Sequence, residues 1–203
     1  MTNHKVSVVI PAFNAEDTIK KAIESVPNRD DIEIIVVDDG STDDTAHIVR
    51  TTGKAVLVRH EENYGVAYAV NTGIDNTQGD YIVLLGSDDY FYTEEFEKAM
   101  EQLDGTDLVY FDLRINDGTV MHLDQDTKEA YCGSVKFMRS DFVGDTRNPE
   151  DKKAGEDWFF YHDLLEKGPT EKFTNLIVKH YNYPREGSLS WQQRNGLIGK
   201  EDE

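Results

Sequence analysis

Two pairs of neighbouring aspartates are the residues in this sequence whose type and spacing most readily do chemistry. They are Asp38-Asp39 and Asp88-Asp89. Adjacent carboxylates repel each other unless a cation or a hydrogen-bond donor lies between them. Hard divalent cations prefer oxygen ligands, and Mg²⁺ typically takes one or two carboxylates together with substrate phosphates. The pairs therefore favour a metal–diphosphate site, and for either pair taken alone the alternative is a solvated turn.

The position of each pair in the chain strengthens this interpretation. Residues 81–85 (YIVLL) form an apolar run typical of a strand buried on both faces, and the run breaks at Gly86 and Ser87. Residues 32–37 form a second such strand, which ends at Asp38. In an open α/β sheet, ligands bind at the carboxyl ends of the strands. We therefore expect both acidic pairs at one edge of the sheet.

The remaining elements predict an α/β fold. Further strands are expected at 6–10, 55–58 and 107–112, with helices between them. Asn14 is expected to cap the first helix and Gly79 to close the third. Strands alternating with helices indicate a mostly parallel, Rossmann-like sheet flanked by helices. Beyond it we expect a hairpin turn at 116–119, a helix from 155 to 168 and one or two short strands at 173–183. We divide the single domain into a nucleotide-type half, 1–112, and a smaller, irregular half, 113–203.

The composition limits the partners and the location. The 203 residues include 21 Lys and Arg against 40 Asp and Glu, a net charge of −19. This charge disfavours a nucleic-acid acceptor, although it leaves a local basic groove open. The single Cys132 fits a reducing compartment, and neither an apolar leader nor a membrane-length apolar stretch is seen. We therefore expect a cytoplasmic protein.

Sequence motifs for competing nucleotide sites are missing. There is no G-x-x-x-x-G-K-[ST] and no G-x-G-x-x-G after a strand, and no His/Cys cluster has zinc spacing. Without a glycine-rich phosphate loop, a diphosphate in this acidic crevice needs a metal ion to neutralise its charge.

Several motifs together resemble the family 2 glycosyltransferases of GT-A fold. They are residues 6–14 (VSVVIPAFN), 36–43 (VVDDGSTD), 63–65 (NYG) with 71–74 (NTGI), 87–89 (SDD), 155–158 (GEDW) and 183–190. They run over nearly the whole chain in order, and the SDD and GEDW stretches are similar to the family's "DxD" and "ED" motifs. The resemblance implies a GT-A fold with a small, mixed acceptor lobe at the C-terminal end.

By this resemblance the chain binds a nucleotide-diphospho-sugar, most often a UDP-sugar. Phe13 would pack on the base or would instead be a core residue, Asp38 would accept a hydrogen bond from the base, and Asp39 would support that loop or the ribose. Asp88 and Asp89 would contact the ribose and hold Mn²⁺ or Mg²⁺, with Asp89 favoured for the metal and the reverse order left open. The residues implied in donor binding are Pro11, Ala12, Phe13, Asn14, Asp38, Asp39, Gly65, Asn71, Ser87, Asp88 and Arg185.

The resemblance also implies the chemistry. Asp157 matches the family's base, which takes the proton of the acceptor hydroxyl while the sugar is attacked from the opposite face, an inverting single displacement. Glu156 would orient the acceptor or the loop. The alternative is that both are an ordinary acidic first helical turn. Trp158 is interpreted as a core residue in preference to an acceptor wall.

Three departures from the family pattern keep other functions open. Gly86 and Val70 stand where members often carry Asp and Arg, and Arg185 lies near a position that is often His, with His180 as a second candidate contact. A donor-binding partner subunit without activity is therefore one alternative. A nucleotidyltransferase, which uses a similar fold, is a weaker one, because residues 11–14 (PAFN) are not the Gly-rich phosphate loop that it should carry after the first strand. The acceptor is undefined: a glycan, a carrier-linked sugar or a small molecule, with a homodimer as one arrangement that could complete its site.

Overall fold

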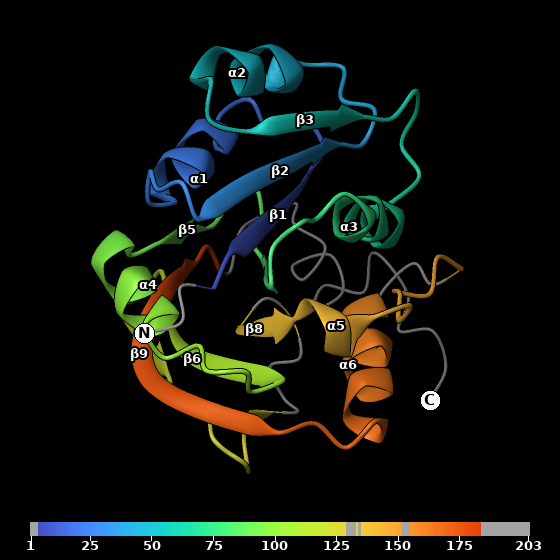
Figure 1. The fold of residues 1–203 in the computed structure, drawn as a ribbon. Helices are drawn as coiled ribbons and strands as arrows, with labels where there is room; N and C mark the ends of the chain where they lie inside the picture. The colour runs from blue at the N-terminus through green and yellow to red at the C-terminus, as the bar shows by residue number, and fades with distance from the viewer. Residues whose placement is uncertain (1–3, 129–132, 134, 152–154, 184–203) are drawn as a thin grey trace.

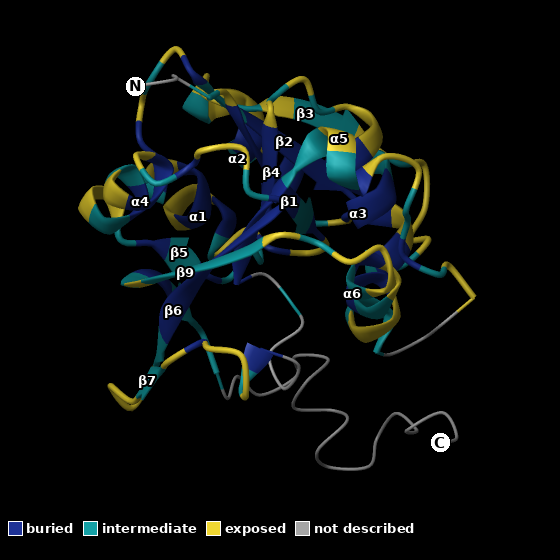
Figure 2. Ribbon diagram, turned by 60° about the horizontal axis from the view of Figure 1, so that its bottom comes forward, coloured by how far each residue is buried: buried dark blue, intermediate teal, exposed yellow. Residues whose placement is uncertain are grey.

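The structure is a computed structural model that describes residues 4–128, 133, 135–151 and 155–183. Its centre is four parallel strands: β1 (Val6–Ala12), β2 (Ile32–Asp38), β3 (Val56–Arg59) and β4 (Tyr81–Leu84). They lie in the order β3-β2-β1-β4. Figure 2 shows β1, β2 and β4 almost wholly in the colour of buried residues, as their apolar runs predict.

The sheet continues with strands of mixed direction. Next to β4 lies β8 (Lys136–Arg139), antiparallel to it, followed by β6 (Leu108–Ile115) and β9 (Glu171–Tyr181). The short β5 (Tyr90–Phe91) pairs with β9, and β7 (Val120–Met121) forms a hairpin with β6. Figure 1 shows the sheet curling from β3 at the top to β9 at the bottom. The mostly parallel α/β fold is as predicted, but β8 separates β6 from β4.

Helices cover both faces of the parallel strands. Alternate residues of β2 point to opposite faces: Ile34 and Val36 pack into the main core, whereas Ile35 and Val37 pack in a second cluster with Ala69. A Cβ on Gly73 would lie 2.2 Å from Val9 Cγ1, so this glycine allows α3 to approach β1 closely. The helices are α1 (Ile19–Ser25), α2 (Thr45–Thr52), α3 (Val66–Asp75), α4 (Thr93–Met100), α5 (Ser140–Val143) and α6 (Glu156–Glu166).

Two local predictions are wrong, and a third, the one or two short strands at 173–183, is right only in part. Asn14 does not cap α1, whose N-cap is Thr18, and Gly79 does not close α3, which ends at Asp75 with Asn76 as its C-cap. Gly79 instead lies against β1, where its N–H donates to Ser7 Oγ (2.9 Å). Residues 171–181 form one long strand, because β9 runs beside β6 with register shifts and does not break.

The described residues contain no helix of the length and apolar character needed to cross a bilayer.

Candidate functional site

A cavity of about 320 Å³ lies at the carboxyl ends of β1 and β4. Three regions that are distant in sequence meet there: the loop after β4, the first turn of α6 and the end of β9. Pro11 of β1 and the apolar face of α3 complete its walls. The described residues that line it are Pro11, Val66, Val70, Leu84, Leu85, Gly86, Leu113, Gly133, Val135, Asn148, Glu156, Asp157, Lys179 and Tyr181.

Asp38 ends β2 and is fully buried; it is in register with Ala12, the neighbour of the cavity residue Pro11. Its Oδ1 accepts a hydrogen bond from the N–H of Ser41 (3.0 Å). Its Oδ2 lies 3.1 Å from Nε of Arg59, but that N–H does not point at the oxygen, and Oδ2 has no hydrogen-bond partner within the described structure. Buried acceptors are nearly always satisfied. An N–H group of a ligand would satisfy this one.

Asp39, in contrast, is fully used by the protein. Its Oδ1 accepts from the N–H of Tyr64 (3.1 Å) and pairs with Nδ1 of His60 (2.7 Å), and its Oδ2 accepts from the N–H of Gly65 (2.8 Å). Gly65 has a φ of +98°, which favours glycine, at the start of α3. Of the two roles considered for Asp39, these contacts favour support of the loop.

The loop after β1 is tied to the loop after β2. The Asn14 N–H donates to Ser41 Oγ (2.9 Å), and its Oδ1 accepts from the N–H of Thr42 (2.9 Å). Asn14 therefore joins two loops across the sequence, which explains why it does not cap α1. Ala12 is buried, whereas Phe13 is 48% exposed. Phe13 is thus not a core residue, and its ring is available at the edge that carries Asp38.

The loop after β4 holds one of its two aspartates in a buried ion pair. Asp89 Oδ2 lies 2.7 Å from Nζ of Lys179, and Asp89 Oδ1 accepts from the N–H of Asn182 (2.8 Å). Ser87 and Asp88 are half-buried. A Cβ on Gly86 would lie 2.9 Å from Asp89 Oδ2 and 3.1 Å from Asp88 Oδ1, so the missing side chain makes room for both carboxylates.

These residues do not fit a divalent ion as they are placed. Both oxygens of Asp89 already have partners, one of them the Lys179 ammonium. The described residues contain no group of three or more His, Cys, Asp or Glu side chains arranged to hold a metal. The prediction of Mn²⁺ or Mg²⁺ at Asp88 and Asp89 stays a prediction.

Glu156 and Asp157 open α6 and line the cavity together. The preceding Gly155 has a φ of +74°, so the chain turns sharply into the helix. Burial raises the pKa of Glu156, and the neighbouring charge of Asp157 adds to the shift. A Cβ on Gly133 would lie 3.2 Å from Asp157 Oδ2, so glycine leaves this carboxylate space. The two carboxylates therefore line the cavity, which an ordinary acidic first helical turn exposed to solvent would not do.

Trp158 corrects an expectation. Its side chain is 44% exposed, so it is not a core residue. Its ring lies 3.9 Å, centroid to centroid, from His162 one turn later, and it contacts Phe159 edge-on. The result is an exposed aromatic face in the first turn of α6, the turn that also carries Asp157.

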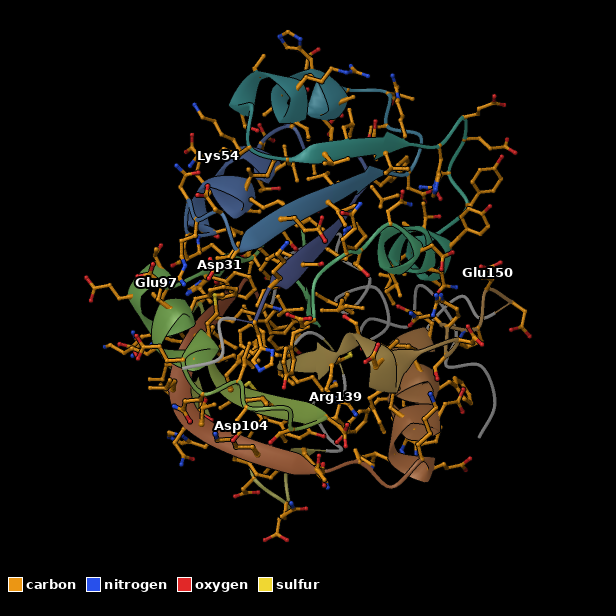
Figure 3. The ribbon with its side chains drawn as sticks, in the orientation of Figure 1. Asp31, Lys54, Glu97, Asp104, Arg139 and Glu150 are labelled. Atoms are coloured by element: carbon orange, nitrogen blue, oxygen red, sulfur yellow. The ribbon has the colours of Figure 1, made fainter. Side chains whose placement is uncertain are left out.

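Asn71 is committed to the protein rather than open to the cavity. Its Oδ1 accepts from the N–H of Asn148 (2.8 Å), and its Nδ2 donates to the Asn148 carbonyl (2.9 Å) and to Glu150 Oε1 (3.0 Å). Figure 3 shows Glu150 on the same side as α3. Asn71 therefore holds the 148–150 segment against α3, and Asn148 in turn lines the cavity.

Of the remaining predicted contacts, only His180 lies within the described residues. Arg185 and the rest of 184–190 fall outside the described residues. His180 stacks on Tyr90 (4.4 Å between centroids), and its Nε2 pairs with Asn116 Oδ1 (2.9 Å). Burial lowers the pKa of His180, as does the charge of Lys21. It therefore has a structural place beside β5. Its neighbour Lys179 was missed, and the signal for it is a lysine following the apolar run 176–178 (LIV).

The fold and the cavity define an α/β protein with a cavity, lined in part by Glu156 and Asp157, at the carboxyl edge of its sheet. The profile of "Glycosyl transferase family 2" matches residues 7–161. The chain therefore belongs to glycosyl transferase family 2.

Individual relatives support this family assignment. An Escherichia coli protein named UDP-Glc:alpha-D-GlcNAc-diphosphoundecaprenol beta-1,3-glucosyltransferase WfaP is 29% identical over 95% of this chain and 82% of its own length. An uncharacterized glycosyltransferase of Rickettsia felis is 38% identical over 52% of this chain. The chain spans only 18% of the length of that relative, and 32% of the succinoglycan biosynthesis protein ExoU of Rhizobium meliloti.

Solved structures confirm the GT-A-like fold. S. aureus TarS 1-349 in complex with UDP-GlcNAc superposes with a TM-score of 0.82 at 22% identity, over 91% of this chain and 60% of that one. The mannosyltransferase PcManGT from Pyrobaculum calidifontis, in complex with GDP-Man and Mn2+, gives 0.73 at 21% identity, over 96% and 61%. At this identity the likeness concerns the fold.

Proposed function

We propose that the chain transfers one sugar, with inversion, from a nucleotide-diphospho-sugar to a hydroxyl of an acceptor. The observation that carries the proposal is a pair of carboxylates at the carboxyl edge of the sheet: Asp38, whose buried Oδ2 has no hydrogen-bond partner within the described structure, and Asp157, which lines the cavity. In the register of the sheet, Asp38 pairs with Ala12, the neighbour of the cavity residue Pro11. One extended ligand can therefore reach both.

The donor is proposed to be a UDP-sugar. Uracil carries one ring N–H flanked by two carbonyl oxygens, and Asp38 Oδ2 is an acceptor that such an N–H would satisfy. The exposed ring of Phe13 lies at the same edge, where a base can pack on it. The E. coli relative named for UDP-Glc, and TarS solved with UDP-GlcNAc, support this choice of nucleotide.

The reaction is proposed to be a single displacement. The acceptor oxygen attacks the anomeric carbon from the face opposite the diphosphate, the bond from that carbon to the phosphate oxygen breaks, and the nucleoside diphosphate leaves with the electron pair. Asp157 takes the proton of the acceptor hydroxyl. Glu156, whose pKa is raised by burial, orients the acceptor. The E. coli relative is named for a β-1,3 linkage, and inversion of an α-linked donor gives a β linkage.

A divalent ion is the predicted means of stabilising the leaving diphosphate. Asp88 and Asp89 are the residues that would hold Mn²⁺ or Mg²⁺, and the Mn2+ complex of PcManGT supports such an ion. The Lys179–Asp89 ion pair argues against it, because a metal at Asp89 would have to displace the ammonium. We therefore base no step on the metal.

The acceptor is proposed to be a sugar, free or borne on a carrier, that approaches past Trp158. Aromatic rings offer sugars a flat apolar surface, and Trp158, which follows Asp157 in the first turn of α6, has 44% of its side chain exposed. The acceptor named in the E. coli relative is a sugar on a diphosphate-linked lipid, which makes carrier-borne sugars the first compounds to try. The cytoplasmic location and the homodimer remain predictions.

The test is a panel of nucleotide sugars offered with carrier-linked and free glycans and read by mass spectrometry. We expect one donor to give a glycosylated product together with the nucleoside diphosphate. Donor binding without product for every acceptor would favour the inactive partner subunit. Pyrophosphate release from a nucleoside triphosphate and a sugar phosphate would favour a nucleotidyltransferase.

A further inference from the structure

The ion pair between Lys179 and Asp89 is almost completely withdrawn from water. The two side chains are 2% and 4% exposed, and Nζ lies 2.7 Å from Oδ2. The ladder between β5 and β9 fixes their approach, since Phe91 is in register with Lys179 and the N–H of Asn182 donates to Asp89 Oδ1 (2.8 Å). The pair is therefore built by the backbone and does not depend on the chance meeting of two long side chains.

Burying two charges is costly, so a pair of this kind points to a role besides stability. Lys179 lines the cavity together with Gly86 and Asp157, and it is the one Lys or Arg among the described residues that do so. The chain as a whole carries a net charge of −19. A ligand with two phosphates would therefore meet carboxylates at this edge and find its counter-charge at Lys179.

We infer that Lys179 is the resident counter-ion of the donor's diphosphate and occupies the place at Asp89 that a divalent ion would otherwise take. This inference rests on the proposed function and adds to it the group that offsets the charge of the leaving diphosphate. An ammonium is a compact charge with three N–H donors, so it can bridge a carboxylate and a phosphate at once. Lys179 and a metal ion then compete for the same carboxylate.

The test is isothermal titration of the full chain with UDP, once in EDTA and once in Mn²⁺. The wild type is expected to bind UDP in EDTA, with an affinity within about threefold of that in Mn²⁺. Lys179→Met is expected to weaken UDP binding in EDTA by roughly 10- to 100-fold, the range for a lost charge-assisted hydrogen bond. Mn²⁺ should restore the affinity of this variant, because Asp89 has lost its competing partner.

A second variant covers the case in which Lys179→Met fails to fold with an unpaired buried carboxylate. The double variant Asp89→Asn with Lys179→Met removes both charges at once. It should fold, bind UDP weakly in EDTA and gain nothing from Mn²⁺. A purely structural ion pair would instead leave UDP affinity in this variant equal to that of the wild type, which would overturn the inference.

The matched control is Arg139→Met. Arg139 pairs with Asp107 (2.5 Å), and its backbone is in register with Tyr81, the first residue of β4, whereas Asp88 follows the other end of that strand. This variant should lose stability but keep the UDP affinity of the wild type in both buffers. The same loss of affinity in Arg139→Met would show that net charge, and not Lys179, governs binding.

Two results distinguish a failure of the inference about Lys179 from a failure of the proposed transferase function. If the wild type binds UDP only with Mn²⁺, the transferase proposal stands and Lys179 is not the counter-ion. If UDP, GDP, CDP, ADP and dTDP all fail to bind in both buffers, the proposed function falls and the inference falls with it.

Discussion

Replacing Asp38 by Asn tests how the base is recognised. The amide keeps the shape of the carboxylate, and its oxygen can still accept the N–H of Ser41 at the Oδ1 position. An NH₂ group then takes the place of Oδ2, the buried oxygen that has no hydrogen-bond partner in the described structure. A donor would thus face the ring N–H of uracil, where the wild type presents a charged acceptor.

The size of the effect follows from this exchange. A hydrogen bond to a charged group contributes about 1.5–3 kcal/mol, so its loss weakens UDP binding by roughly 10- to 150-fold. Cytosine carries a ring acceptor where uracil carries the N–H, so the new NH₂ suits CDP. We expect the variant to lose most of its preference for UDP over CDP.

The assay is calorimetric titration of the wild type and of Asp38→Asn with UDP and with CDP. Arg59→Met is the control variant. Arg59 is close to Asp38 but half exposed, and its removal leaves Oδ2 free for the ligand. The control should keep the preference for UDP. If Asp38→Asn leaves UDP affinity unchanged, or weakens UDP and CDP equally, Asp38 does not read the base.

Three further substitutions test the cavity walls. Gly86→Ala places a Cβ 2.9 Å from Asp89 Oδ2. UDP affinity should therefore fall, while the melting temperature changes by only a few degrees. Unchanged UDP affinity would contradict the argument that a side chain at this position crowds the carboxylates. Trp158→Ala should raise KM for the acceptor and leave UDP affinity unaltered, because the ring is exposed and lies outside the lining of the cavity. A loss of UDP affinity would show that the ring contacts the donor instead. Burial and the charge of Asp157 raise the pKa of Glu156, so ionised Glu156 costs the fold stability above its ordinary pKa. Glu156→Gln should therefore raise the melting temperature at pH 7.5, with no difference below about pH 4, and an equal gain at both pH values would refute the cause.

The sequence predicts the central strands well because burial on both faces leaves a clear mark. Residues 81–84 are all apolar, and such a run has few other places in a fold. The strand β8 leaves no such mark. Its sequence is KFMR, and it becomes a central strand only because β4 and β6 lie on either side. Lys136 is buried there with Nζ on the Gly133 carbonyl (3.0 Å), a contact that no periodicity reveals.

The candidate site likewise has a part that the sequence predicts and a part that it does not. The acidic pairs are visible because their position after buried strands is a local pattern. Their partners are not local. Asp89 pairs with Lys179, which lies far away in the sequence. Asn14 stands where a helix cap is expected, yet its Oδ1 accepts a hydrogen bond from the N–H of Thr42, 28 residues away. Long-range contacts of this kind override local preference, and a local sequence pattern does not reveal them.

The most direct test of the account is Asp157→Asn, measured for binding and turnover in the same preparation. The amide keeps the volume of the side chain but cannot take the proton of the acceptor hydroxyl. We expect UDP affinity within about threefold of the wild type. Release of the nucleoside diphosphate from the donor should fall by about 100-fold or more, the usual contribution of a general base. Full turnover in Asp157→Asn, measured beside an active wild type, would contradict the account.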